Sequence, residues 1–466
     1  SLLLTSVEIP NDSELQIIDD AAFQKTEIEH IFIPSGITRI STRCFYWCIS
    51  LSKIEFDSKS KLQIIDEEAF YDSGIDTISI LSQVTQINHY AFSNCNKLKN
   101  VKISEKLKRI NEGVFQSTSI DSISIPSSVI EIGDYALGTK SLKKIEIQKD
   151  TNLNMIGECA FFNSIIESLT IPASVTNLKD GWCCLTPKLN EIKVESNNPK
   201  YKMYEDKLLI GKSNIDEEKY DVLVFCCRDV EEITIPNFIE IISPYAFDSC
   251  KKLQKIEFQS NSKLRIIGEC CFSDSKIRHI SIPPSVKIIS EFSFLRCNFL
   301  QKVEIPSNSE LETIENNVFD ESSIESLTIP ASVINLKDGW CSSTSNLKEI
   351  KIDPMNPKYK MYEDKLLIGK SNIKEEKYDV LVFCARNVEK IIIPSFIEII
   401  SPYAFDFCTE LEKVEFQSNS KLRIICNFSF SNASLSSITI PPHVTKICEY
   451  AFMKCKNLQK VEFLPD

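Results

Sequence analysis

One apolar pattern recurs along this chain at a nearly constant interval. It reads Leu/Ile/Val-x-x-Ile/Leu/Val-x-Ile/Phe/Val, and nineteen copies occur in 466 residues. Their first residues are Leu4, Ile28, Leu51, Ile75, Leu98, Ile120, Leu142, Ile166, Leu189, Val230, Leu253, Ile277, Leu300, Ile324, Leu347, Val388, Leu411, Leu435 and Leu458. Successive copies are 22 to 24 residues apart, except for two intervals of 41 residues. Such a period predicts a solenoid of stacked coils.

The segment Ile277–Phe299 illustrates how one coil is expected to fold. Ile280 and Ile282 alternate with polar residues, as in a strand with one buried face. Pro283 ends the strand because it has no N–H to donate to a neighbouring strand. A second extended arm follows, and Phe294 closes the turn. One coil cannot bury its own apolar side, but stacked coils share a continuous core.

Longer periods lie above the single coil. Two coil types alternate, one with a Cys three residues after an aromatic residue and one with a longer return arm, so that a pair covers 47 residues. The starts Leu189 and Leu347 differ by 158 residues, as do Leu253 and Leu411. The segment PKYKMYEDKLLIGKSN also occurs twice, 158 residues apart, at 199–214 and 357–372. These spacings indicate an internal duplication that includes both long intervals.

The unit L-x-x-I-x-I-P-x-x-V-x-x-I-x-x-x-A-F-x-x-C resembles the BspA-type (Treponema pallidum-type) leucine-rich repeat. The resemblance is plainest in SSVIEIGDYAL and HVTKICEYAFMKC, and a longer-armed form appears in CTELEKVEFQSNSKLRIICNFSF. It covers essentially the whole chain. Such repeats are abundant in surface antigens of bacteria and of parasitic protists such as Trichomonas. The repeats here are rich in Ile, Lys, Asn and Cys, and this composition is similar to that of the protist members. The resemblance implies a curved solenoid and adhesion to host cells or extracellular matrix.

We therefore expect a single continuous leucine-rich repeat domain over residues 1–466. The predicted fold is a curved, right-handed stack of about nineteen coils with a long parallel β-sheet, and with short strands, turns or 3₁₀ elements opposite. The two long intervals predict β-hairpin-like insertions at about 196–229 and 354–387. Both chain ends stop inside the pattern without a polar cap, which leaves open either a fragment or weak terminal coils.

The charge and the apolar segments exclude several classes of partner. A net charge of −12 and a pI near 5.2 argue against nucleic-acid binding, which requires a clustered basic surface. No apolar stretch approaches the ~20 residues that cross a bilayer, so no direct membrane insertion is expected. The chain shows no signal peptide, but it does not begin with Met, so this absence carries little weight.

No arrangement of residues predicts an enzyme, a cofactor or a metal site. The four histidines, His30, His89, His279 and His443, have no metal ligand or nucleophile at a recurring distance. The GKS sequences at 211–213 and 369–371 echo the end of a phosphate-binding loop. That loop needs a glycine where Asp206 and Asp364 stand, and a carboxylate there would repel phosphate. We expect hairpin turns and no nucleotide.

The eighteen cysteines are interpreted through their place in the repeat. One slot recurs at Cys48, Cys95, Cys250, Cys297, Cys408 and Cys455, and a thiol in a fixed register is expected to fill the core. Alternate coils lie ~10 Å apart, which is too far for a disulfide. The thiol or disulfide state of the adjacent pairs at 183–184, 226–227 and 270–271 stays open. Unpaired thiols favour a reducing compartment, against the cell-surface or secreted location that the resemblance implies.

The two insertions are the predicted binding contacts, because they depart from the repeat. The candidate residues are Tyr201, Met203, Tyr204, Lys207 and Tyr220 in the first, and Tyr359, Met361, Tyr362, Lys365 and Tyr378 in the second. They would form two projecting contacts suited to bivalent binding. The alternative is that each insertion only covers a flank of the solenoid. The outward strand slot, in which charged and hydroxyl residues alternate, is explained by stability alone and names no ligand.

The predicted function is that of a non-catalytic, adhesin-like surface antigen that binds a protein or a glycan. Its expected partners are ligands on host cells or extracellular matrix. The alternative is an intracellular, cytoplasmic scaffold for protein–protein interaction, which the many thiols favour. The sequence leaves the ligand and the oligomeric state open.

Overall fold

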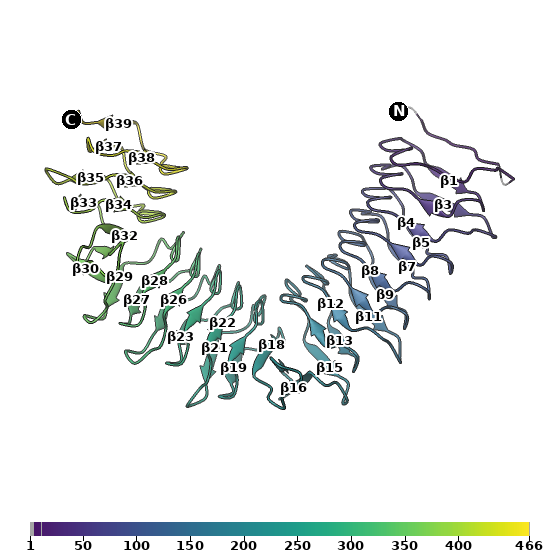
Figure 1. Ribbon diagram of the computed structural model, residues 1–466, viewed down its shortest axis with the longest axis horizontal. Coiled ribbons are helices and arrows are strands. Elements are labelled where there is room, and N and C mark those ends of the chain that lie inside the picture. The colour runs from purple at the N-terminus through teal and green to yellow at the C-terminus, as the bar shows by residue number, and fades with distance from the viewer. Residues whose placement is uncertain (1–3, 11, 466) are drawn as a thin grey trace. The chain divides into compact units, whose positions relative to one another are not determined.

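A computed structural model describes residues 4–10 and 12–465. It is a parallel β-solenoid of about nineteen coils in which the described residues form strands and turns and no helix (Figure 1). This confirms the predicted fold class. The chain divides into two compact units, which are described separately: unit 1 comprises Ser1–Lys219 with Phe225–Asp229, and unit 2 comprises Tyr220–Val224 with Val230–Asp466. The expectation of one continuous domain stays a prediction.

Each regular coil contributes one strand of three or four residues to what we call the long-strand row. In unit 1 this row consists of β1 (His30–Ile33), β3 (Lys53–Phe56), β5 (Thr77–Ser79), β7 (Asn100–Lys102), β9 (Ser122–Ile125), β11 (Lys144–Ile147), β13 (Ser168–Ile171) and β15 (Glu191–Val194). In unit 2 it consists of β19 (Glu232–Ile235), β21 (Lys255–Phe258), β23 (His279–Ser281), β25 (Lys302–Glu304), β27 (Ser326–Ile329), β29 (Glu349–Ile352), β33 (Lys390–Ile393), β35 (Lys413–Phe416), β37 (Ser437–Ile440) and β39 (Lys460–Phe463).

A second row of two-residue strands, the short-strand row, follows along the same coils. In unit 1 it consists of β2 (Arg39–Ile40), β4 (Ile64–Ile65), β6 (Gln86–Ile87), β8 (Arg109–Ile110), β10 (Glu131–Ile132), β12 (Met155–Ile156) and β14 (Asn177–Leu178). In unit 2 it consists of β20 (Ile241–Ile242), β22 (Ile266–Ile267), β24 (Ile288–Ile289), β26 (Thr313–Ile314), β28 (Asn335–Leu336), β34 (Ile399–Ile400), β36 (Ile424–Ile425) and β38 (Lys446–Ile447).

The two rows differ in the continuity of their hydrogen bonding. Most long strands pair in parallel two by two, such as β9 with β11, although β23, β25, β27 and β29 form one sheet of four. The short strands form longer sheets, such as β8 to β14 in unit 1 and β20 to β28 in unit 2. The predicted parallel pairing is therefore present in both rows. The sheets with the most strands are formed by the short-strand row.

The second insertion is a three-stranded meander of β30 (Tyr359–Tyr362), β31 (Leu366–Gly369) and β32 (Val380–Cys384). β30 pairs antiparallel with β31, and β31 pairs antiparallel with β32 through a bulge. β32 then pairs in parallel with β34, so it takes the place of a short strand. In the first insertion, β16 (Tyr201–Tyr204) and β17 (Leu208–Gly211) form the same hairpin, and β18 (Val222–Cys226) pairs with β20.

Stacked phenylalanine rings run through the core of each unit. In unit 2, the ring centroids of Phe272 and Phe294 are 5.3 Å apart, and those of Phe294 and Phe319 are 5.5 Å apart. Unit 1 has a matching stack that includes Phe70 and Phe92 at 5.2 Å. All five of these rings are fully buried. Each coil of these stacks thus supplies one ring that its neighbours cover.

The turn that follows each short strand also ties a coil to the next. Phe292 and Arg296 have φ of 55° and 53°, so left-handed residues occur at intervals along the turn. The N–H groups of Phe294 and Arg296 donate to carbonyl oxygens of the next coil, each at 2.9 Å. No β-branched residue occupies a left-handed position in the described part of the chain, as expected from its steric cost there.

Replacing Phe294 by Ala is expected to lower the free energy of unfolding by about 3–5 kcal/mol, because the buried ring is lost and a cavity remains. Phe299→Ala is the matched control, since Phe299 is 48% exposed, and its loss should change stability by about 0.5 kcal/mol or less. Urea unfolding followed by circular dichroism measures both variants. Equal losses for the two would contradict the role of the stacked rings.

Candidate binding surface

The outward side chains of the long-strand row form what we call the long-strand face. About every second strand carries a Lys–Glu ion pair between residues two apart, which point to the same side. The pairs are Lys53–Glu55, Lys144–Glu146, Lys193–Glu191, Lys255–Glu257, Lys302–Glu304, Lys351–Glu349, Lys413–Glu415 and Lys460–Glu462. Each exposed pair contributes little stability, about 0–1 kcal/mol. Their main effect is to make the face locally neutral.

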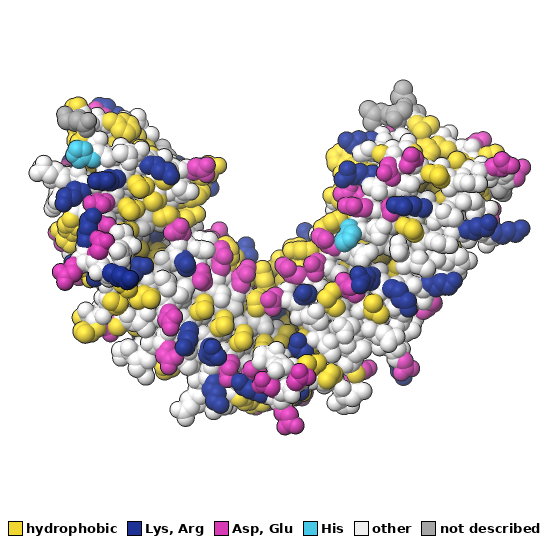
Figure 2. Space-filling model, viewed as in Figure 1, with side chains coloured by type: hydrophobic (Ala, Val, Ile, Leu, Met, Phe, Trp, Pro, Cys, Tyr) yellow, Lys and Arg dark blue, Asp and Glu magenta, His cyan; other side chains and the backbone are white. Residues whose placement is uncertain are grey.

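Basic and acidic side chains are interspersed over the surface in view in Figure 2. Between the charged strands lie strands with hydroxyl side chains, such as Ser281 of β23 and Thr328 of β27. A surface of this kind offers no continuous positive field to a polyanion. It can instead form neutral hydrogen bonds and apolar contacts where the surface is hollowed.

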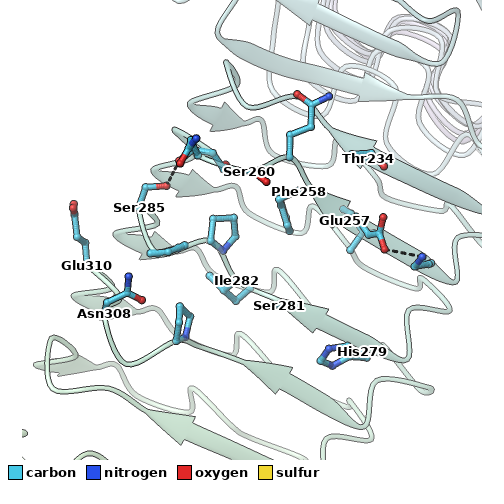
Figure 3. Close-up of a pocket in the computed structure, with 18 of the residues that line it drawn as sticks. Thr234, Glu257, Phe258, Ser260, His279, Ser281, Ile282, Ser285, Asn308 and Glu310 are labelled. Atoms are coloured by element: carbon cyan, nitrogen blue, oxygen red, sulfur yellow. Dashed lines mark hydrogen bonds and ion pairs between the residues drawn. The ribbon is translucent and has the colours of Figure 1, made fainter.

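A hollow on this face lies in unit 2 and has a volume of about 1030 Å³. We call it the first groove. Its lining comes mainly from β21, β23 and the turns that follow them, with Thr234 of β19 and residues of the turn after β25. Figure 3 shows Phe258 and Ile282 near its centre, with Ser285 and Asn308 on one side and His279 on the other. The groove therefore combines an apolar floor with a rim of hydroxyl, amide and charged side chains, among them Lys255, Glu257 and Glu310. An apolar pocket with a few polar groups is the usual composition of a ligand site.

Internal hydrogen bonds fix the rim of the first groove. Pro283 ends the strand and leads into a turn in which Ser285 Oγ lies 2.8 Å from the carbonyl oxygens of both Ser262 and Leu264, so that its one hydroxyl proton is shared between them or donated to either. Gln259 Oε1 accepts the N–H of Asn237 at 3.1 Å. At the other side, His279 Nε2 lies 3.5 Å from Glu304 Oε2. The groove is thus held open before any ligand binds, which lowers the entropic cost of binding.

A second groove of about 610 Å³ occurs in unit 2 at the positions 158 residues further on. Phe416 takes the place of Phe258, and the Pro441–Pro442 pair takes the place of Pro283 and Pro284. His443 stands where the first groove has Ser285. The two grooves share their floor but differ in their rim. In the sequence, both grooves are marked by an FQSNS segment, at 258–262 and 416–420, and by an IPP segment, at 282–284 and 440–442. The sequence analysis did not connect these segments with a site.

The predicted contact residues Tyr201 and Tyr359 lie in the core, each only 4% exposed. The Tyr359 hydroxyl accepts the N–H of Leu336 at 3.0 Å, and the Tyr201 hydroxyl accepts that of Leu178 at 3.0 Å. This corrects the expectation that these two tyrosines project. They anchor each insertion to the preceding coil, because a buried phenol hydroxyl requires a hydrogen-bond partner.

Asn198 and Asn356 complete these anchors. The Asn356 amide nitrogen donates to the carbonyl oxygens of Pro330 and Val333, each at 2.9 Å. Its Oδ1 accepts the N–H groups of Lys358 and Tyr359 at 3.0 and 2.8 Å. Asn198 makes the same four bonds in the first insertion. Sequence analysis missed both residues, although an Asn-Pro-Lys-Tyr segment recurs at each.

The other candidate residues of the insertions are at least partly exposed. Met203, Tyr204, Tyr220, Met361, Tyr362 and Tyr378 are half-buried, and Lys207 and Lys365 are exposed. The Tyr362 ring packs edge-on against Phe396 with centroids 5.8 Å apart. Tyr378 lies beneath Lys360 Nζ, 4.0 Å from its ring centroid. These contacts hold the meander to its coil, and a binding role for the residues stays a prediction.

The GKS turn of the second insertion is closed by a carboxylate. Ser371 donates its N–H to Asp379 Oδ1 at 2.9 Å and its hydroxyl to Oδ2 at 2.7 Å. Burial alone would raise the pKa of Asp379, but the hydrogen bonds from Ser371 and the nearby charge of Lys377 outweigh burial and lower it. The backbone and hydroxyl donors of Ser371 are therefore occupied by this carboxylate.

The repeating cysteines lie inside the stack. Cys48, Cys95, Cys250, Cys297 and Cys408 have no exposed surface, whereas Cys455 is half-buried. Burial raises the pKa of Cys95 and of Cys297 to about 12, so both thiols stay protonated at neutral pH. A protonated thiol is a poor nucleophile and a poor metal ligand. These cysteines contribute packing and weak hydrogen bonds to backbone carbonyl groups.

Cys408 differs because a buried arginine lies against it. Arg386 is 1% exposed and its Nη1 lies 3.4 Å from Cys408 Sγ. Burial would raise the pKa of Cys408, but a hydrogen bond from Cys384 and the charge of Arg386 lower it. The guanidinium also lies 4.5 Å from the centroid of the Phe383 ring. This arrangement places a charge in the core at the point where the second insertion rejoins the stack.

Within residues 4–10 and 12–465, no group of three His, Cys, Asp or Glu side chains is placed to hold a metal ion. The same residues include no helix that is long and apolar enough to cross a membrane.

Coils of 22 to 24 residues, each with a long and a short parallel strand, define a leucine-rich repeat solenoid. The model of the BspA type leucine rich repeat region matches residues 2–96, 63–190, 221–353 and 379–466. The chain therefore belongs to the BspA-type leucine-rich repeat family. The matched ranges leave out 191–220 and 354–378, which contain the hairpins of the two insertions.

Several solved structures are similar to this chain. A leucine-rich repeat protein from Eubacterium ventriosum has 21% identity and a TM-score of 0.42, over 91% of this chain and 82% of that one. A leucine rich cell surface protein from Faecalibacterium prausnitzii has 19% identity and a TM-score of 0.47, over 86% and 83%. The pneumococcal vaccine antigen PcpA has 18% identity and a TM-score of 0.39, over 94% and 79%. Similarity at this level assigns no function to the chain.

No curated protein sequence matches the chain.

Replacing Asn356 by Ala should weaken the attachment of the second insertion by about 1–3 kcal/mol, because its backbone partners lose their hydrogen bonds. Amide hydrogen exchange in β31 is expected to become faster, and so is proteolytic cleavage between residues 370 and 378. Asn372→Ala is the control, since Asn372 is exposed and bonds only within its own turn. Unchanged exchange in Asn356→Ala would show that this side chain is not an anchor.

Proposed function

We propose that this chain is a non-catalytic binding protein whose long-strand face in unit 2 binds a protein or a glycan. The observation that carries the proposal is the first groove, with its volume of about 1030 Å³, its apolar floor and its polar rim held by hydrogen bonds. Its repetition as a second groove in the same unit provides two contacts for one ligand.

We further propose that the protein is a surface or secreted antigen of a parasitic protist and that it attaches to host cells or extracellular matrix. The support for this location is membership of the BspA-type family together with the resemblance of its repeats to those of surface antigens. The locally neutral long-strand face also suits a neutral ligand better than a polyanion.

The second candidate function is that of an intracellular scaffold for protein–protein interaction. The observation that favours it is that repeat cysteines such as Cys48, Cys95 and Cys297 are buried free thiols. Free thiols persist in reducing compartments. Localisation of the tagged full-length protein, with thiol counting under denaturing and non-reducing conditions, separates the two functions. Mostly paired cysteines would contradict the intracellular scaffold.

The double variant Ser281→Arg with Thr439→Arg is expected to weaken binding to a panel of matrix proteins and host glycans at least tenfold. Each arginine would extend from the long-strand face into one groove and occupy the space that the ligand needs. Both positions point outward from their strands, so the fold should be retained. Surface-immobilised panels with the variant in solution measure the dissociation constants.

Thr170→Arg is the matched control, because it adds the same side chain at an exposed outward position of β13 in unit 1. Its binding should equal that of the unaltered protein. A variant with Met361→Ala and Tyr362→Ala reports on the second insertion in the same assay. If that variant loses binding while Ser281→Arg with Thr439→Arg keeps it, the grooves are not the binding surface.

A further inference from the structure

A small pocket of about 210 Å³ lies in unit 2 where the second insertion meets the coil before it. Three lysines line it: Lys337, Lys358 and Lys370. They come from three separate segments, namely the turn after β28, the turn before β30 and the turn after β31. Among the residues that the structure describes, the ion pairs do not include any of these three side chains. Lys358 Nζ lies 5.5 Å from the ring centroid of Tyr359 and Lys370 Nζ lies 5.1 Å from that of Tyr378, and both contacts leave the positive charge in place. The pocket therefore concentrates positive charge that ion pairs do not neutralise.

The backbone at each lysine is held by hydrogen bonds. Next to Lys337, the N–H of Leu336 donates to the Tyr359 hydroxyl at 3.0 Å. The N–H of Lys358 donates to Asn356 Oδ1 at 3.0 Å. Beyond Lys370, Ser371 is bound to the Asp379 carboxylate. The three side chains consequently leave fixed points around one pocket, as a preorganised site requires.

Electrostatics oppose this arrangement in the absence of an anion. Lys358 is half-buried, and burial together with the charge of Lys337 lowers its pKa. One carboxylate, that of Asp338, also lines the pocket. Three ammonium groups and one carboxylate leave two positive charges, on a protein whose net charge is −12. A doubly charged anion would balance the pocket and relieve the repulsion between the lysines.

We propose that this pocket binds a tetrahedral, doubly charged oxyanion of the phosphate type, either as the free ion or as a monoester. Lysine ammonium groups bind phosphate as point charges, and three of them around a cavity of about 210 Å³ match a single such group. The site is unlike a nucleotide-binding loop, because the Ser371 donors are already bonded to Asp379. The proposal stands independently of ligand binding in the grooves.

The sequence of the first insertion carries the same three lysines. Lys179, Lys200 and Lys212 precede the second set by 158 residues each. The duplication thus kept every lysine of the cluster, together with Asp180 in the place of Asp338.

The test is a titration of the full chain with inorganic phosphate, followed by ³¹P NMR line width and by the thermal unfolding midpoint. Sodium chloride at equal ionic strength corrects for general salt effects. Phosphate is expected to broaden the ³¹P resonance and to raise the unfolding midpoint, since it binds the folded state alone. Lys358→Met should weaken this phosphate binding at least tenfold.

Lys374→Met is the matched control, because Lys374 is exposed on the same insertion and does not line the pocket. It should bind phosphate as the unaltered chain does. Lys337→Met tests the site a second time at an exposed position, in case Lys358→Met fails to fold. Equal binding by the Lys337, Lys358 and Lys374 variants, or no response beyond that to chloride, would overturn the proposal.

Two further titrations distinguish the source of the phosphate group. The first uses glycerol phosphate, which is a phosphate monoester. The second uses glycerol, which lacks the charged phosphate group and serves as the control. Binding of glycerol phosphate that Lys358→Met abolishes would support a monoester ligand. Binding of inorganic phosphate alone, with the same dependence on Lys358, would support the free ion.

Discussion

The contact between one coil and the next is the interaction on which the rest of the structure depends. A coil of 22 to 24 residues has too little surface to enclose its own apolar side chains, so its stability comes from its neighbours. Two kinds of contact provide it. Fully buried rings such as Phe294 stack from coil to coil, and backbone hydrogen bonds of the turns and short strands join each coil to its two neighbours.

This arrangement separates the parts of the coil that stabilise the protein from the parts that are free to vary. The short-strand row carries the longer sheets, and the long-strand row is mostly paired two by two. Outward residues of the long strands, such as Ser281, therefore have little effect on the stack. A groove arises where the longer FQSNS arm of one coil lies beside the Ile-Pro-Pro turn of the next. The duplicated block repeats this juxtaposition, and with it the candidate site.

Much of the fold could be predicted from the sequence, because the physical cause was local and repeated. The spacing of apolar residues predicted the coils, and Pro283 marked the end of its strand. The turn could not be predicted, since Phe292 and Arg296 carry no sequence sign of a left-handed conformation. Their conformation is imposed by the backbone hydrogen bonds to the next coil. Tyr359 lies on a strand within the insertion predicted at about 354–387, but the sequence did not reveal that its side chain packs into the core.

The candidate groove could not be predicted because it is formed by loops of different coils. Phe258 and Pro283 are 25 residues apart, and each has an ordinary role within its own coil. Only the stack brings them together. The same holds for the lysines at 337, 358 and 370, whose shared pocket follows from the way the second insertion packs on its coil.

Side-chain footprinting by hydroxyl radicals, with and without a saturating matrix protein or glycan ligand, tests most directly whether the grooves are the binding surface. The account predicts that the ligand protects Phe258 and His279 of the first groove and Phe416 of the second from oxidation. Met361 and Tyr362 of the second insertion should be oxidised as in the free protein. Protection of Met361 and Tyr362 with unchanged oxidation of the groove residues would contradict the account.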